Sequence, residues 1–402
     1  KTMTDARNGT STLIYDDADR RVSQTTPASG GGQSAQTTTT YFDDLGRVWK
    51  TVQPDGTSVT NEYHLTMEPK KTYGSRVYPE ERGYDYSGRL KTLKTWQSFA
   101  TDSGAAVTIW NYHTNRGWLV SKQYADSQGP SYTYSAAGRL ASRTWARGVV
   151  TTNTYDYAGQ LATVDYSDST PDVGFFYDRR GRQTGVTNTN DAITYVHNDA
   201  GQLVAEVHGA GVLDGLTITN TYDHLLRRTN LAAFNASTQL TASAYGYDHA
   251  SRMASVSDGT NSAHYGYLAN SALVESIAFK QSGTTRMTTT KSYDYVNRLT
   301  GVSSTSSVAA VSFAYAYNSA NQRTRVDEAD GSYWLYEYDS LGQVTSAKRY
   351  ASGGYVMPGQ QHEYTYDDIG NRKTAKSGGN QYGTSLREST YGVNALHQYT
   401  NR

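Results

Sequence analysis

Short runs of apolar or aromatic residues at every second position alternate along the chain with turns rich in glycine, aspartate and asparagine. Near residue 335, Trp334, Tyr336 and Tyr338 fall on one face of an extended strand, and the residues between them fall on the other. No stretch shows sustained helical periodicity. The pattern predicts an all-β protein of short strands, in which neighbouring hairpins stack aromatic rings in rows. The same Tyr-x-Tyr spacing recurs at Tyr132/Tyr134, Tyr245/Tyr247, Tyr265/Tyr267 and Tyr364/Tyr366.

A seven-residue phrase recurs along the whole sequence. It consists of a tyrosine, an acidic or amide residue, two variable residues, a glycine, a polar or basic residue and usually an aliphatic one, here numbered positions one to seven. Seventeen copies between residues 15 and 391 give a period of about 23.5 residues, which is typical of a repeat protein. Weaker copies begin at Tyr15, Phe42, Tyr63, Tyr112, His197, Tyr222, Tyr247, Tyr267, Tyr293, Tyr317 and Tyr391. In the six clearest copies the candidate structural positions are Tyr84, Asp85, Gly88, Arg89, Tyr134, Gly138, Arg139, Tyr155, Asp156, Gly159, Tyr177, Asp178, Gly181, Tyr338, Asp339, Gly342, Tyr366, Asp367 and Gly370.

Each copy is interpreted as the tip of a β-hairpin. Aspartate at position two can accept hydrogen bonds from the backbone ahead of it, and glycine at position five can adopt a left-handed conformation. Asp19, Asn297 and Asn321 replace that glycine in three copies, and these residue types tolerate positive φ best after glycine. Leu226 and Ser251 do not, so we expect another turn type at those two tips. Turns at the opposite end of the hairpins are predicted at Pro54-Asp55-Gly56, Asp258-Gly259, Ser282-Gly283 and Asp330-Gly331.

Composition favours one continuous array over residues 1–402, without a domain boundary. The glycine-rich segments at residues 25–40 and near Gly353 are expected to be loops. The 37 basic and 37 acidic residues balance, and no basic stripe interrupts the repeats, so nucleic acid is not an expected partner. There is no cysteine and no run of eighteen apolar residues, so we expect neither disulfides nor a membrane span. Because the chain begins and ends within repeats, we expect it to be a piece of a longer protein.

The repeated YDxxGR phrase resembles the Rhs/YD-repeat family over almost the whole chain. This family includes shells of bacterial polymorphic toxins, cocoon subunits of tripartite insecticidal toxins, wall-associated bacterial proteins and teneurin ectodomains. The segment Tyr391–Thr400, YGVNALHQYT, resembles the NALNQY phrase found late in such arrays. The resemblance implies a long antiparallel ribbon of hairpins that spirals into a hollow shell or barrel-like cocoon, and a ribbon of some thirty strands also has to curl because strand twist accumulates.

The resemblance further implies that, in the toxin members of the family, the hollow holds a C-terminal polypeptide that is released by self-cleavage at a DPxGL-type motif. This sequence has no Asp-Pro dipeptide, so that cleavage centre is absent from residues 1–402.

Candidate catalytic and metal-binding groups are better explained by the repeat. The pairs Asp16/Asp17, Asp43/Asp44 and Asp367/Asp368 occupy positions two and three, where capping and solvent exposure are expected. The segment His208–Gly211 is similar to an esterase oxyanion loop, but no GxSxG motif accompanies it. Asp327, Asp330 and Gly331 lack the alternating ligands of a calcium loop, and no HExxH spacing or nucleotide-binding loop occurs. We therefore expect no catalytic, metal or cofactor site.

The leading hypothesis from the sequence is a non-enzymatic shell segment of a large exported bacterial protein, secreted or on the cell surface. It would enclose or display a polypeptide cargo or neighbouring domains of the same parent protein. The alternative is an adhesion module that binds surface glycans through exposed aromatic rows. An enzyme ranks third.

Overall fold

The computed structural model describes residues 1–30 and 32–402, and strands make up most of this part. The first eighteen strands are β1 (Thr2–Asp5), β2 (Gly9–Tyr15), β3 (Arg21–Thr25), β4 (Thr37–Phe42), β5 (Val48–Val52), β6 (Ser58–Tyr63), β7 (Pro69–Gly74), β8 (Glu80–Tyr84), β9 (Leu90–Ser98), β10 (Ser103–Tyr112), β11 (Leu119–Gln123), β12 (Ser131–Tyr134), β13 (Leu140–Thr144), β14 (Val150–Tyr155), β15 (Leu161–Tyr166), β16 (Val173–Tyr177), β17 (Gln183–Thr187) and β18 (Ala192–His197). The others are β19 (Leu203–His208), β20 (Leu216–Tyr222), β21 (Arg228–Asn235), β22 (Thr238–Tyr247), β23 (Met253–Ser257), β24 (Asn261–Tyr267), β25 (Val274–Gln281), β26 (Thr284–Tyr293), β27 (Leu299–Ser306), β28 (Ala310–Tyr317), β29 (Arg323–Glu328), β30 (Tyr333–Tyr338), β31 (Val344–Tyr350), β32 (Val356–Tyr366), β33 (Arg372–Gly378), β34 (Leu386–Thr390), β35 (Gly392–Val393) and β36 (Tyr399–Asn401).

One antiparallel sheet contains the strands from β1 to β34, and each of these strands pairs with the next one along the chain. The short strands β35 and β36 form a separate hairpin. The single helical element among the described residues is the 3-10 turn η1 (Gly211–Leu213). The all-β hairpin ribbon expected from the sequence is confirmed.

The phrase turns all lie at one end of the hairpins, which we call the tip rim, and the remaining turns lie at the other end, the opposite rim. A β-bulge accompanies the tips, because the returning strand carries one extra residue. At the tip between β8 and β9, Tyr84 pairs with Leu90 whereas Gly83 pairs with Thr92. The same register shift occurs at the first residue of the other phrases, for example at Tyr155. Since bulges strengthen the local twist, their repetition on one rim favours curling of the ribbon.

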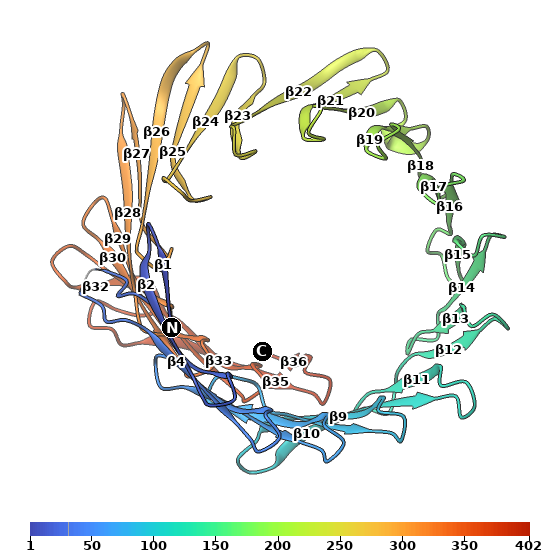
Figure 1. Cartoon of the computed structure of the whole chain (residues 1–402), viewed down its shortest axis with the longest axis horizontal. Helices are drawn as coiled ribbons and strands as arrows, with labels where there is room; N and C mark the ends of the chain where they lie inside the picture. Colours follow the sequence, from blue (N-terminus) through green and yellow to red (C-terminus); the bar gives the residue numbers. More distant parts are fainter. Residues whose placement is uncertain (31) are drawn as a thin grey trace.

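Figure 1 shows that the ribbon runs once around a ring and then overlaps its own beginning. The last strands of the sheet, β29 to β33, return to the side where the N-terminal strands lie, and the middle of the ring is open. The hairpin of β35 and β36 and the C-terminus lie inside the ring in this view. No strand pairing joins β34 to β1 in the part of the chain that is described, so the ribbon is a spiral with two free edges.

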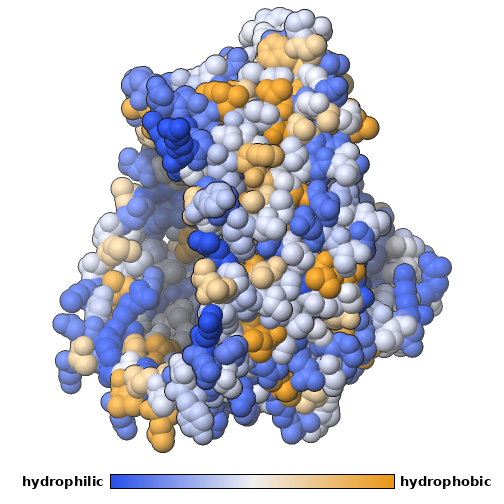
Figure 2. Space-filling view, turned by 90° about the vertical axis from the view of Figure 1, so that its right-hand side faces the viewer, coloured by the Kyte–Doolittle hydropathy of each residue, from blue (hydrophilic) through white to orange (hydrophobic). Residues whose placement is uncertain are grey.

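The wall of the ring is a single sheet without a thick core. Only four apolar side chains in the described residues are buried, Trp96, Ala106, Ala232 and Val326, and most strand residues are half-buried. Figure 2 shows hydrophobic residues scattered among hydrophilic ones on one side of the wall. None of the described helical segments is long and apolar enough to cross a membrane. Ladder hydrogen bonds and contacts between successive hairpins therefore hold the wall together.

The loop between β3 and β4 covers most of the glycine-rich segment at residues 25–40. It lies on the opposite rim, as predicted for a loop, although Gly31 is outside the described residues. The turn at Gly353 and Gly354 connects β31 with β32, also on the opposite rim, and Gly354 has a φ of 82°. Both glycine-rich segments are therefore rim loops.

Candidate functional site, the repeat turns and the ring seam

Aspartate at position two organises the tip of each typical hairpin. Asp85 accepts hydrogen bonds at Oδ1 from the backbone N–H groups of Ser87 (2.8 Å) and Arg89 (3.1 Å), while its Oδ2 accepts one from Arg89 Nε at 2.7 Å. The Arg89 guanidinium, together with these backbone donors, holds the pKa of Asp85 below its ordinary value. The same bond between aspartate Oδ2 and arginine Nε occurs at Asp16, Asp43, Asp178, Asp223, Asp248 and Asp294.

The arginine at position six then contacts the tyrosine of the following copy. The Arg89 guanidinium lies 4.4 Å from the ring centre of Tyr112, and the Tyr112 hydroxyl donates a hydrogen bond to the carbonyl oxygen of Leu90 at 2.8 Å. We call this arrangement, from aspartate through arginine to the next tyrosine and back to the carbonyl at position seven, the repeat clasp. Where all of its parts are present, it links a hairpin to the next one along the ribbon, as at Arg47, Arg227, Arg252 and Arg298. Tyrosine hydroxyls make the equivalent bond at Tyr63, Tyr134, Tyr155, Tyr222, Tyr247, Tyr267, Tyr293, Tyr317 and Tyr338.

Three tyrosines of the clear copies occupy position one without this hydroxyl bond among the described contacts, namely Tyr84, Tyr177 and Tyr366. Each follows a copy whose sixth residue is Glu68, Gln160 or Gln343, but Tyr222 and Tyr338 make the bond although they follow Gln202 and Gln322. Tyr84 instead meets the His64 ring edge-on, with ring centres 5.7 Å apart. Three of the clear copies have an amide residue and not arginine at position six. Their aspartates, Asp156, Asp339 and Asp367, still accept a hydrogen bond from the backbone N–H four residues ahead, at 2.7 to 2.9 Å.

Position five has positive φ in the tips, as a type I turn followed by a left-handed residue requires. The values are 74° at Gly88, 79° at Gly138, 83° at Gly159, 80° at Gly181, 93° at Gly342 and 87° at Gly370. Asp19, Asn297 and Asn321 take the same conformation, with φ between 57° and 66°.

The expectation of another turn type at Leu226 and Ser251 was wrong. Their φ values are 63° and 61°. Their N–H groups donate hydrogen bonds to the backbone carbonyl oxygens of Asp223 and Asp248, as the N–H groups of the glycines do in other tips. The capping aspartate and the flanking arginine therefore hold even unfavourable residues in the left-handed conformation. The last copy also needs correction, because its turn runs from Asn394 to Gln398, so position one is Val393 and not Tyr391.

Stacked aromatic rows occur in the region of β30 to β32. The described residues show no such row at Tyr132/Tyr134, Tyr245/Tyr247 or Tyr265/Tyr267, where the same pattern predicted one, and Tyr134 packs on Trp118 instead, with ring centres 5.1 Å apart. Trp334 stacks on Tyr336 and on His362, with ring centres 6.3 and 6.4 Å apart, and His362 stacks on Tyr364 at 6.5 Å. A second pair, Tyr333 and Tyr350, stacks across two paired strands at 5.2 Å. The rows are part of the packing of the wall.

The ring seam, where the second turn of the ribbon meets the first, joins tips of residues 294–370 to opposite-rim loops of residues 5–102. At its start, the Tyr295 N–H donates to the Ser29 carbonyl oxygen at 3.1 Å, and Arg298 Nη2 donates to Gln33 Oε1 at 2.8 Å. Arg7 donates to Asn297 Oδ1. Hydrogen bonds across the seam join residues that are 244 to 290 positions apart in sequence, which is the length of one turn of the spiral.

The far end of the seam has a two-point contact at Asp368. Its Oδ2 accepts the Phe99 N–H at 2.7 Å, and its own N–H donates to the Gln97 carbonyl oxygen at 3.0 Å. Phe99 also packs on Trp96, with ring centres 5.1 Å apart, and Trp96 is 2% exposed. Sequence analysis missed this role, because it treated Asp368 like Asp17 and Asp44, which occupy the same position three and are exposed to solvent.

Arg76 connects the middle of the seam. It donates from Nη1 to the Ser340 carbonyl oxygen at 3.2 Å and from Nη2 to the Ala320 carbonyl oxygen at 3.4 Å, and it lies 3.5 Å from Asp55. The seam is therefore made of polar contacts between a tip rim and an opposite rim, without strand pairing.

The other candidates from the sequence do not form a catalytic or metal-binding arrangement. His208 is buried, with Nδ1 2.8 Å from Asp191 Oδ2 and Nε2 3.2 Å from Glu206 Oε1. The Gly209 N–H, which an oxyanion hole would need, donates to the Ala192 carbonyl oxygen at 2.8 Å. No group of three or more potential metal ligands comes together within residues 1–30 and 32–402.

Asp330 caps its own turn rather than joining a calcium site. Its Oδ1 accepts the Ser332 N–H at 2.8 Å, and these bonds lower the pKa of the Asp330 carboxyl group. Asp327 pairs with Arg325 at 2.6 Å instead.

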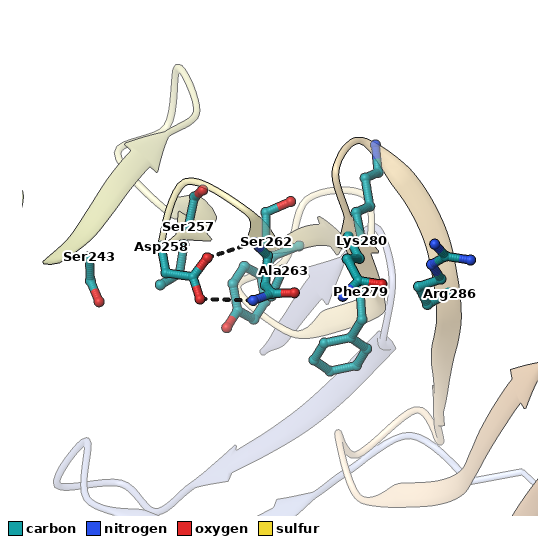
Figure 3. Close-up of a pocket in the computed structure, with 12 residues that line it drawn as sticks. Ser243, Ser257, Asp258, Ser262, Ala263, Phe279, Lys280 and Arg286 are labelled. Atoms are coloured by element: carbon teal, nitrogen blue, oxygen red, sulfur yellow. Dashed lines mark hydrogen bonds between the residues drawn. The ribbon is translucent and has the colours of Figure 1, made fainter. Parts of the chain in front are cut away.

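A cavity of about 560 Å³ opens between the hairpins of β23 to β26. Figure 3 shows its polar groups spread along the wall, with the Lys280 and Arg286 side chains extending away from the turn at Asp258. Asp258 Oδ2 accepts Asn261 Nδ2 at 2.9 Å, so the carboxylate is used within its own turn. The groups do not converge on a common point, and the cavity is an open part of the wall.

Comparison with known proteins identifies the repeat and the fold. Residues 317–355 match the family model for the RHS Repeat, and no curated protein sequence matches the chain significantly. The solved structure of TcdB2-TccC3 is similar over 95% of this chain and 24% of its own, with a TM-score of 0.58 and 14% identity. The structure of TcdB2-TccC3 without its hypervariable C-terminal region has a TM-score of 0.54 and 13% identity, over 97% of this chain and 27% of its own. The structure of TcdB2-TccC3-Cdc42 has a TM-score of 0.52 and 13% identity, over 92% of this chain and 23% of its own.

The spiral ribbon, the clasped tips and the seam define a β-hairpin repeat protein whose sheet curls into a ring (Figure 1). The segment that matches the RHS Repeat model contains copies of the phrase that recurs from residue 15 to residue 370. At the identities found, the solved structures establish the fold alone. The chain spans about a quarter of the length of the solved chains it matches.

Proposed function

We propose that the chain is a non-enzymatic wall segment of a large bacterial YD-repeat protein and that this wall encloses or displays another polypeptide, such as a toxin domain. The ring seam carries the proposal, since it fixes the second turn of the ribbon onto the first and so holds the wall around an open middle (Figure 1). A ribbon that served only as an extended display surface would not need contacts between residues 244 to 290 positions apart.

Two further observations support a structural role. In the copies that carry it, the repeat clasp uses the aspartate and the arginine of the tip for contacts within the turn and with the next hairpin, so these charged groups are already engaged. The solved structures with the same fold are named as complexes of more than one component, TcdB2-TccC3 and TcdB2-TccC3-Cdc42. We infer that this chain likewise works with polypeptide partners, in a protein exported to the cell surface or secreted, and that residues 1–402 form one array of about seventeen units.

Electron microscopy of the natural polypeptide that contains this segment tests the proposal. We expect a hollow body whose wall follows the spiral of Figure 1, with density for a second polypeptide inside it or at its rim. A solid rod, or a wall that stays open along the seam, would contradict it. Limited proteolysis provides a second readout, because an enclosed polypeptide is cut more slowly than the same polypeptide expressed alone.

A further inference from the structure

The fourth position of the phrase distinguishes tips inside the ring seam from tips outside it. In the seam this residue is Val296, Ala320, Leu341 or Ile369, always apolar and always half-buried. In the other tips of the sheet it is exposed. The exposed residues at this position are Ala18, Leu45, Thr66, Ser87, Asn115, Ala137, Ala158, Arg180, Ala200, Leu225, Ala250 and Asn270. A covered fourth position is therefore the mark of a docked tip.

Three consecutive free tips carry large apolar residues that nothing in the described structure covers. Leu45 is 64% exposed, Leu65 and Tyr86 are fully exposed, and Met67 is 53% exposed. Their hairpins touch one another, since Arg47 Nη1 lies 3.3 Å from the His64 carbonyl oxygen and 3.8 Å from Met67 Sδ. We call these four residues the rim patch. Fully exposed leucine and tyrosine side chains grouped on one rim are typical of an interaction surface.

The opposite rim carries exposed apolar residues as well. Val308, Tyr355 and Tyr382 lie in its turns and are 93%, 76% and 79% exposed. The molecule therefore presents two different apolar rims at its two ends, and the seam shows how one kind of rim fits the other. The formal net charge of zero adds no long-range repulsion between copies.

From these observations we propose that the rim patch docks the opposite rim of a second copy of this chain, head to tail, in the same tip-rim-to-opposite-rim arrangement as the ring seam but through apolar instead of polar contacts. The contact joins two unlike surfaces, so each added copy leaves a free rim patch and a free opposite rim. Such an interface does not close on itself, and it produces a growing stack of rings and not a two-fold dimer.

Sedimentation velocity over a hundredfold range of concentration tests this proposal on the 402-residue chain. We expect the wild-type chain to form dimers and longer stacks as the concentration rises. The double variant L65D/Y86D should weaken association at least tenfold, because it places two carboxylates in the docked contact. The matched control is F176D, which changes an exposed aromatic residue in strand β16, outside the turns of either rim. It should associate like the wild type, and circular dichroism should show the same strand content in all variants.

A mixing experiment separates head-to-tail docking from other modes of association. The variant Y355D/Y382D disables the opposite rim but keeps the rim patch, whereas L65D/Y86D does the reverse. We expect each variant alone to stay monomeric and an equal mixture to give dimers that do not grow. Association that survives L65D/Y86D would point to the edge strands β1 and β34, and a mixture that stays monomeric would point to a patch-to-patch contact. Either result, or a wild-type chain that is monomeric throughout, overturns the proposal.

Discussion

Residues of the phrase make contacts within their own turn and contacts with other hairpins, and only the contacts within the turn can be predicted from the local sequence. The capping role of Asp85 follows from its place before a glycine, because short-range hydrogen bonding to the backbone is a local property. The orientation of Arg89 over Tyr112 depends on a hairpin 23 residues further on, and no local rule contains it. Leu226 shows the same limit, since the tertiary setting holds it at a φ that its residue type disfavours.

The replacement Leu226→Gly should stabilise its hairpin. Leucine at a φ of 63° carries a conformational cost of about 1–2 kcal/mol, and the greater chain entropy of unfolded glycine offsets part of the gain. We expect a net gain of roughly 0.5–1 kcal/mol. Because a repeat array opens locally, native-state hydrogen exchange of the β20–β21 hairpin is the suitable measurement.

Leu225→Gly is the matched control. Leu225 is the neighbouring tip residue, similarly exposed but without positive φ, so glycine should slightly destabilise the hairpin there. If both variants changed the exchange rates in the same direction, the strain assigned to Leu226 would not exist.

At the scale of the element, the hairpins and their order were predictable because strand alternation and turn chemistry are both local. The tips, the opposite turns at Gly56, Gly259, Gly283 and Gly331, and the rows at Trp334 were all expected from the sequence, and the structure contains them. The repeat clasp was not expected, although its residues were noticed. The sequence pattern that predicts the repeat clasp is arginine at position six of one copy together with an aromatic residue at position one of the following copy.

The replacement Tyr155→Phe tests the repeat clasp. It removes the hydroxyl group that donates to the Leu140 carbonyl oxygen at 2.8 Å, and it leaves Asn153 Nδ2, at 3.2 Å, as the remaining side-chain donor to that carbonyl. We expect the β14–β15 hairpin to lose about 1 kcal/mol, seen as roughly fivefold faster exchange of its slowest amides.

Tyr157→Phe serves as the control on the same tip, since Tyr157 is fully exposed and at position three. It should leave exchange unchanged. Equal effects of the two variants would show that the hydroxyl bond contributes nothing specific to the contact between hairpins.

The tips also predict sensitivity to acid. Hydrogen bonds hold the pKa of Asp16, Asp43, Asp85, Asp178, Asp223 and Asp248 below the ordinary aspartate value of 3.8. With a folded pKa below the unfolded one, the stabilisation is fully present above the unfolded value and is lost as the pH falls through the folded value. We therefore expect constant urea midpoints from pH 7 to pH 5 and a progressive fall below about pH 4.

The variant Asp85→Asn checks the origin of that fall. It keeps a side-chain oxygen for the backbone donors but removes one titrating group, so its midpoint should drop less than that of the wild type between pH 7 and pH 3. An identical drop would mean that other carboxylates, and not those of the tips, cause the loss of stability.

At the scale of the whole molecule, the sequence predicted that the ribbon curls but not where it meets itself. Curling follows from the number of strands and their twist. The position of the ring seam depends on the summed twist of all the hairpins in one turn of the spiral, so a small change of twist in each hairpin would change which loop every tip contacts. The sequence therefore does not distinguish Asp17, Asp44 and Asp368, which share position three of the phrase. In the structure, only Asp368 contacts the neighbouring turn of the spiral.

The replacement Asp368→Ala should loosen the ring seam without unfolding the ribbon. It removes the acceptor of the Phe99 N–H, so the Phe99 amide should exchange faster, and small-angle scattering should show a larger radius of gyration. Asp44→Ala is the matched control, because Asp44 has the same place in its phrase and lies in solvent. Loss of strand signal in Asp368→Ala, or equal exchange at Phe99 in both variants, would contradict the seam assignment.

Because the ring seam joins rims and not strands, the circumference of this wall is not fixed by sheet closure. Duplication or loss of one repeat unit in the gene would leave the ladders on either side intact and would only change which loop each tip faces. A lineage could therefore resize the chamber by recombination between near-identical repeats, one unit at a time, without having to evolve a new fold.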